Sequence, residues 1–142
     1  MKKPTDELLK ILKSKNSVEE YFEENDDEIF FGTLSEMLDF YRVRKNISKA
    51  EVARKSNIKR EYCYEILRGD TNKKPSRDKV IMLCFGLSLT VEESQQVLKK
   101  SGYAPLYARD TRDSIIIFSL SHNISVVKTN ITLEDYGLDP LL

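Results

Sequence analysis

Apolar residues recur at helical spacing between residues 47 and 69, with polar residues at the intervening positions. The pattern predicts two short helices, one from a Ser48 N-cap to about residue 55 and one over residues 59–68. Asn57 falls in the turn between them, where it tolerates a left-handed backbone, and Gly69 is a typical C-terminal stop. Two helices and a tight turn at this spacing predict a helix-turn-helix motif. We expect its buried face to consist of Val52, Ala53, Ile58, Cys63, Ile66 and Leu67.

Capping signals predict three further helices around this motif. Thr33 and Thr90 each precede a Glu by three residues, which is the spacing of a capping box. Ser76, directly after Pro75, is the expected cap of the remaining helix. The inner faces follow from apolar residues three and four positions apart: Leu34, Met37, Leu38 and Tyr41 in the first helix, and Val80, Leu83, Cys84 and Leu87 in the helix after Ser76.

The C-terminal segment fits two secondary structures. Its two apolar runs fit a β-hairpin that turns at residues 121–123. They also fit two helices, the first starting near Arg112, with Ser125 capping the second and Gly137 ending it. We favour the helices, because these residues are typical of helix starts and stops. In either structure the isoleucines at residues 115–117 are expected to pack in the core or against a second subunit.

The N-terminal residues 1–31 contain two short helical patterns, followed by an acidic run at residues 23–28. A capping box that opens at Ser17 predicts the second of these helices. The acidic run is expected to be a loop or a linker. Aromatic residues in this segment can anchor it to its own domain or to a partner subunit.

The helix-turn-helix resembles that of the phage repressor and Cro type, the Xre-like class of bacterial regulators. The resemblance covers residues 33–87. It implies that the second helix lies in the DNA major groove, with its first turn at the base edges. The class usually has Gln where Lys49 stands and Gly where Asn57 stands; the fold survives both changes, but sequence specificity becomes unpredictable. The matching residues are Ser48, Val52, Ala53, Ile58, Ile66, Gly69 and the Pro75–Ser76 pair.

The predicted fold class is therefore all-α. A compact five-helix, repressor-like bundle is expected over residues 32–103, which form the DNA-binding domain. Residues 1–31 are expected to be an N-terminal helical arm, and residues 104–142 a C-terminal helical extension that can serve dimerisation. A hairpin in this extension stays an alternative.

The charge is zero overall but unevenly distributed along the chain. Residues 32–87 contain thirteen Lys or Arg against seven Asp or Glu, a net charge of +6, whereas residues 1–31 carry −4 and residues 88–142 carry −2. Between residues 42 and 60 there are eight basic residues and one acid. The positive charge thus coincides with the helix-turn-helix, where contact with DNA phosphates would need it.

The exposed side of the second helix supplies the candidate base-reading residues. Arg60 can donate two hydrogen bonds to guanine, and Glu61 or Glu65 can accept one from the amino group of cytosine. Glu61 can equally form an ion pair with a neighbouring Arg, and Tyr62 can pack on an adjacent helix. The candidate base-reading set is Lys59, Arg60, Glu61, Tyr62 and Glu65. By the resemblance, the candidate phosphate-contacting set is Ser48, Lys49, Arg68, Lys73 and Lys74.

Double-stranded DNA is the expected partner, bound by a homodimer at a roughly palindromic site. The N-terminal arm and residues 115–120 are the candidate dimer interfaces. The two acids on the reading helix, Glu61 and Glu65, leave a second hypothesis open. In that hypothesis the chain is an antitoxin-like or adaptor module that kept the fold and binds a basic protein.

An enzyme is not expected. The single histidine, His122, lies in a predicted turn, and there is no second histidine for a metal site and no Gly-rich phosphate loop. We therefore predict no catalytic residue, metal or cofactor, and the sequence indicates no particular small-molecule effector. Cys63 and Cys84 are interpreted as reduced core thiols, and no apolar run reaches the ~18 residues of a membrane span. The N-terminus lacks the pattern of a secretory signal, so a cytoplasmic protein is expected.

Overall fold

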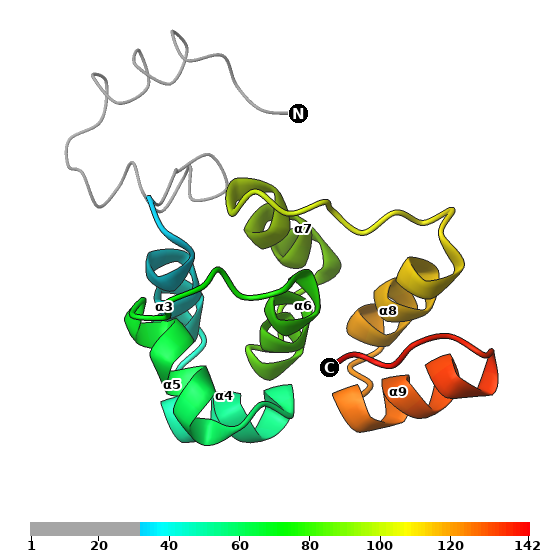
Figure 1. Cartoon of the computed structure of the whole chain (residues 1–142), viewed down its shortest axis with the longest axis horizontal. Coiled ribbons are helices and arrows are strands. Elements are labelled where there is room, and N and C mark those ends of the chain that lie inside the picture. Colours follow the sequence, from blue (N-terminus) through cyan, green and yellow to red (C-terminus); the bar gives the residue numbers. More distant parts are fainter. Residues whose placement is uncertain (1–31) are drawn as a thin grey trace, which may run out of the picture. The chain divides into compact units, whose positions relative to one another are not determined.

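The computed structural model of the protein describes residues 32–142, whose regular secondary structure consists entirely of helices (Figure 1). The predicted all-α class is thereby confirmed for this part of the chain, and the β-hairpin alternative is wrong. The predicted N-terminal arm, residues 1–31, lies outside the described residues. The helices are α3 (Leu34–Arg44), α4 (Lys49–Ser56), α5 (Arg60–Arg68), α6 (Arg77–Gly86), α7 (Val91–Lys100), α8 (Thr111–Ser121) and α9 (Val126–Asp135).

The helix starts confirm the predicted caps. The hydroxyl of Ser48 accepts a hydrogen bond from the backbone N–H of Glu51, and Ser76 and Ser125 cap α6 and α9 in the same way. At α7 both halves of the Thr90 capping box are present. At α3 the Thr33 hydroxyl also caps the helix, but its Glu36 partner accepts from that hydroxyl at 3.0 Å.

Helices α4 and α5 contact each other and lie where the two helices of the helix-turn-helix were predicted. Asn57 ends α4 in the left-handed conformation, with φ of 61° and ψ of 31°. Gly69 ends α5 with φ of 77°, and its N–H donates to the carbonyls of Glu65 and Ile66. The predicted interior face is also confirmed, because each of its residues is at most 6% exposed: Val52, Ala53, Ile58, Cys63, Ile66 and Leu67.

Helix α6 is the central element of the described structure (Figure 1). The prediction gave it a single inner face, yet every residue from Val80 to Gly86 is buried. It packs most extensively on α4, where Gly86 permits the close approach. A Cβ atom at Gly86 would lie 2.7 Å from the carbonyl oxygen of Val52 and 2.9 Å from the Cβ of Ser56. The absence of a side chain at Gly86 therefore sets how closely α4 can approach α6.

Helices α8 and α9 pack against each other as an antiparallel pair in the C-terminal extension (Figure 1). Helix α8 begins at Thr111 behind an Asp110 cap, slightly before the predicted start. Ile116 is completely buried in it, while its two isoleucine neighbours are half-buried. After α9 the chain turns back, and the Asn130 side chain forms two hydrogen bonds with the backbone of Leu141, at 2.7 and 3.1 Å. Leu141 is fully buried as a result.

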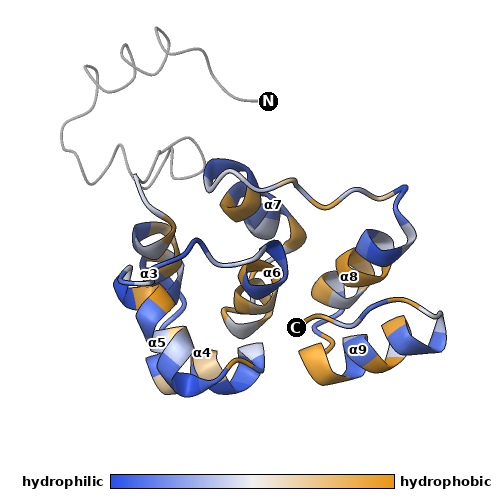
Figure 2. Ribbon diagram, in the orientation of Figure 1, coloured by the Kyte–Doolittle hydropathy of each residue, from blue (hydrophilic) through white to orange (hydrophobic). Residues whose placement is uncertain are grey.

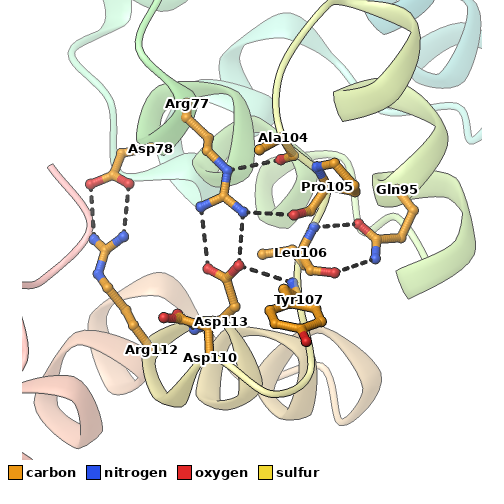
Figure 3. Close-up of polar contacts among 10 residues, drawn as sticks. All are labelled: Arg77, Asp78, Gln95, Ala104, Pro105, Leu106, Tyr107, Asp110, Arg112 and Asp113. Carbon is orange, nitrogen blue, oxygen red and sulfur yellow. Dashed lines mark hydrogen bonds and ion pairs between the residues drawn. The ribbon is translucent and has the colours of Figure 1, made fainter.

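Two ion pairs attach α8 to α6; we call them the α6–α8 ion-pair cluster (Figure 3). Arg77 of α6 donates to both carboxylate oxygens of Asp113 on α8, at 3.2 and 2.9 Å. Arg112 of α8 donates in the same bidentate way to Asp78 of α6, at 3.0 and 2.9 Å. Hydrogen bonding to Asp78 raises the pKa of Arg112. The two pairs cross between the same two helices, so each helix carries one cation and one anion.

The segment between α7 and α8 is held by side chains on its backbone. Gln95 of α7 accepts from the N–H of Leu106 at 2.7 Å and donates to its carbonyl at 2.8 Å (Figure 3). Arg77 donates to the carbonyls of Ala104 and Pro105. The C-terminal extension is thus attached to the preceding helices through α6 and α7. None of the helices in residues 32–142 combines the length and apolarity that crossing a membrane requires.

Candidate nucleic-acid interface

The start of α5 is exposed and has no side-chain cap. Lys59 occupies the N-cap position, and its side chain forms no hydrogen bond to the helix. Each of the other six described helices has such a bond at its start. The first N–H groups of a helix point outward with a partial positive charge, which makes an uncapped start suited to an anion such as a phosphate. Lys59, Arg60 and Glu61 are all exposed there.

Arg60 is held in place by Tyr64, one turn further along α5. Its Nε donates to the Tyr64 hydroxyl at 3.1 Å, and its guanidinium lies 5.5 Å from the centre of the Tyr64 ring. This hydrogen bond raises the pKa of Arg60. The contact uses Nε and leaves both terminal nitrogens for other acceptors. A planar donor with two free amino groups is suited to the edge of a guanine.

The two acids of α5 differ in position. Glu61 is exposed in the first turn, where a carboxylate interacts favourably with the helix dipole. Glu65 is half-buried, and its carbonyl accepts from the N–H groups of Gly69 and Asp70. Within residues 32–142, neither carboxylate lies within 4.0 Å of a basic side chain, so the ion pair considered for Glu61 does not form in this part of the chain.

Tyr62 is turned toward α6 instead of lying beside the other candidate readers. It is half-buried, and the ammonium of Lys79 on α6 lies 5.9 Å from the centre of its ring. This is the packing on a neighbouring helix that the sequence left open. The structure thus groups Lys59, Arg60 and Glu61 at the exposed start of α5 and places Tyr62 at its side.

The candidate phosphate-contacting residues divide by their partners. The Ser48 hydroxyl is engaged in capping α4. Arg68 forms an exposed ion pair with Asp70 at 3.0 Å, and the Lys74 ammonium lies 4.2 Å from the ring centre of Tyr103. Lys49 and Lys73 are exposed, and among the described residues neither has an acidic partner within 4.0 Å.

Much of the positive charge of residues 32–87 is engaged elsewhere. Within residues 32–142, ion pairs join five of its basic residues to acids, and two of those acids lie outside the segment. Arg77 belongs to the α6–α8 ion-pair cluster, and Lys45 pairs with Glu93 of α7 at 2.9 Å. The cations that stay exposed without an acid partner in the described structure include Lys49, Lys59, Arg60 and Lys73.

A cavity of about 460 Å³ lies between the end of α4, the end of α6 and the turn before α9. Cys84 of α6 contributes to its wall, and burial raises the pKa of this thiol to about 12. Cys63 is also free and buried, with its pKa raised to about 11 for the same reason. Neither thiol is appreciably ionised near neutral pH, so both behave as core residues, as the sequence predicted.

His122 is exposed at the end of α8 and contacts its own helix. Its ring stacks on Phe118 at 4.0 Å, and its Nδ1 lies 2.9 Å from the Phe118 carbonyl oxygen. Within residues 32–142, no group of three or more His, Cys, Asp or Glu side chains could hold a metal ion. No family model, curated protein or solved structure matches the chain. The chemistry of the α5 surface is therefore the basis for a functional assignment.

Proposed function

We propose that the protein is a sequence-specific DNA-binding transcriptional regulator of the repressor type. The observation that carries this proposal is the exposed start of α5, where an uncapped helix end coincides with Lys59 and Arg60. Such a helix end attracts phosphate, and an arginine beside it can read a base. The proposal places α5 in the major groove of duplex DNA.

The surrounding helices support this placement. In this proposal, helices α3–α7 would form the five-helix frame that the resemblance to repressor and Cro proteins implies. The left-handed conformations of Asn57 and Gly69 at the ends of α4 and α5 support it. A rigid frame matters, because base recognition requires the reading side chains to be positioned before contact. The close packing of α4 on α6 at Gly86 holds the first helix of the motif in position.

The exposed side chains at the start of α5, at Lys49 and at Lys73 have distinct roles in this proposal. Arg60 donates to a guanine while Tyr64 holds its Nε, and Glu61 accepts from a cytosine amino group. Lys49 and Lys73 contact phosphates and position the protein without reading sequence. Two copies bound to a palindromic site would place two α5 helices in successive major grooves.

A second candidate function is binding of a basic protein partner. The observation in its favour is that Glu61 is exposed and has no basic partner within 4.0 Å among residues 32–142. In this case capture of the partner should survive Lys49→Ala and Arg60→Ala but fail after charge reversal of Glu61 and Glu65. The opposite pattern would reject the second candidate.

Selection from a random duplex DNA library with the full chain tests the main proposal. We expect wild type to enrich a defined motif and Arg60→Ala to lose the preference at one base position. Arg109→Ala is the matched control, because Arg109 is also an exposed arginine but lies between α7 and α8. It should enrich the wild-type motif. Failure of wild type to enrich any sequence would overturn the proposal.

A further inference from the structure

Exposed apolar side chains are concentrated in the C-terminal part of the described structure. Seven large hydrophobic residues are exposed within residues 32–142, and six of them follow residue 104. Residues 32–104 contribute only Val43 of α3, at 62% exposure. Exposed apolar residues indicate a contact surface where they lie next to one another on one face. The six residues are Tyr107, Phe118, Val127, Ile131, Tyr136 and Leu142.

Helix α9 has two distinct faces. Val126, Thr129 and Leu133 are buried against the rest of the domain. On the opposite side, Ile131 is 56% exposed and Val127 is 55% exposed, four residues apart on one stripe. The apolar colouring along α9 is visible in Figure 2. We define the outward α9 face as Val127, Lys128, Ile131, Glu134 and Asp135, all of which are exposed.

The charges on this face run against the helix dipole. Lys128 lies in the first turn of α9, where the dipole is positive, and Glu134 and Asp135 lie in the last turn, where it is negative. Every other described helix carries an acid in its first turn; α9 does not. In an isolated helix this arrangement is unfavourable by a small amount at each end.

A second copy of the same face, placed antiparallel, would offset the unfavourable charge at both ends of α9. If a two-fold axis passes at Ile131, residues three before and three after it face each other across the axis. Lys128 of one copy then lies opposite Glu134 of the other, twice, with the two Ile131 side chains in contact at the centre. The acids of one copy also come to the positive helix start of the other. The face is therefore complementary to itself at Lys128, Ile131 and Glu134, which is the requirement of an isologous contact, while Val127 comes opposite Asp135.

We infer that the outward α9 face is a homodimer contact, with α9 packed antiparallel on its copy about Ile131. The contact does not depend on DNA, but its use in presenting two α5 helices to a palindromic site rests on the proposed function. A ten-residue helix offers a small interface, so we expect a weak dimer that a two-site DNA would strengthen through effective concentration.

Sedimentation equilibrium of the full chain over a range of concentrations tests the contact. Wild type should show a reversible monomer–dimer equilibrium, and Ile131→Asp should raise its dissociation constant by at least about tenfold, a factor that corresponds to 1.4 kcal/mol. Val43→Asp is the matched control, because it introduces the same charge at an exposed apolar residue of α3. It should leave the dissociation constant unchanged. Thermal unfolding of each variant verifies that it is folded.

Charge exchange tests the pairing itself. Lys128→Glu alone and Glu134→Lys alone should each weaken the dimer, and the double variant Lys128→Glu with Glu134→Lys should recover it. A monomeric wild type, equal effects of Ile131→Asp and Val43→Asp, or no recovery in the double variant would overturn the inference. Binding of Ile131→Asp to a half-site duplex separates the two proposals. If Ile131→Asp binds the half-site and still dimerises like wild type, only the α9 contact is refuted. If Ile131→Asp loses the dimer but wild type binds no DNA, only the proposed function is refuted.

Discussion

Two groups of arginines in this protein have opposite surroundings. At the start of α5, Arg60 is exposed and contacts a tyrosine of its own helix. In the α6–α8 ion-pair cluster, the side chain of Arg77 is only 27% exposed and is bidentate to Asp113, whose side chain is 9% exposed. An arginine of the first kind is available to a ligand, and one of the second kind holds two helices together. Net charge counted along the chain does not distinguish them.

Not all of the positive charge of residues 32–87 is available to a ligand. Arg77 contributes to the excess of +6 in residues 32–87, yet its partner lies 36 residues further along the chain. Under the proposed function, the charge that would face DNA is accordingly smaller than the net charge of the segment suggests. It would lie at α5, the start of α4 and the loop after α5. Arg77→Ala and Arg60→Ala each act on one of these two groups of arginines, and Gly86→Ala acts on the packing of α4 against α6.

The largest effect is expected from Arg77→Ala. The change removes both hydrogen bonds from Arg77 to Asp113 and leaves that buried carboxylate, within the described structure, with the N–H of Tyr107 as its remaining donor. Loss of one partner of a largely buried pair should lower the free energy of unfolding by about 3 kcal/mol, measured by urea denaturation. Arg54→Ala breaks an ion pair whose arginine is 72% exposed and should cost less than about 1 kcal/mol. Equal losses in the two variants would contradict the structural role of the cluster.

Gly86→Ala tests how closely α4 packs against α6. The added methyl would lie 2.7 Å from the Val52 carbonyl oxygen, so α4 has to move away from α6. Overpacking of this kind should lower the free energy of unfolding by about 1–3 kcal/mol. Gly32→Ala is the control, since the nearest described atom to its added methyl is a flexible Glu36 oxygen at 3.7 Å. A Gly86→Ala variant as stable as wild type would show that α4 and α6 have room for a methyl group at this position.

Arg60→Ala tests the exposed group. We expect a loss of about 1–3 kcal/mol in binding free energy at one base pair of the selected site, measured by competition with single-base variants, and no change in stability. Tyr64→Phe removes the hydroxyl that accepts from Arg60 Nε and should produce a smaller loss at the same position. If Arg60→Ala weakened all sequences alike, Arg60 would be a phosphate contact and not a base reader.

Local signals were sufficient to predict most helix boundaries. Ser48, Asn57 and Gly69 define the helix-turn-helix through capping and left-handed turns that depend on adjacent residues alone. The complete burial of α6 was not predicted, because burial from all sides depends on which helices surround it. The role of Gly86 has the same origin, since the contact it permits is with Val52 on another helix.

The candidate site was predictable to a similar extent. Helical periodicity correctly placed Lys59, Arg60 and Glu61 on an exposed surface. The four-residue spacing of Arg60 and Tyr64 is a signal from which their contact could have been read. The contact of Lys74 with Tyr103 could not, because the two residues belong to different elements brought together only by folding.

The measurement that tests the central claim most directly is the salt dependence of duplex binding. The logarithm of the association constant should fall linearly with the logarithm of salt concentration, because phosphate contacts release counterions. Lys73→Ala should weaken all sequences alike and reduce the slope by about 1, whereas Lys99→Ala on α7 should leave it unchanged. Duplex binding that is absent, or insensitive to salt from low to moderate ionic strength, would contradict a DNA-binding function for this protein.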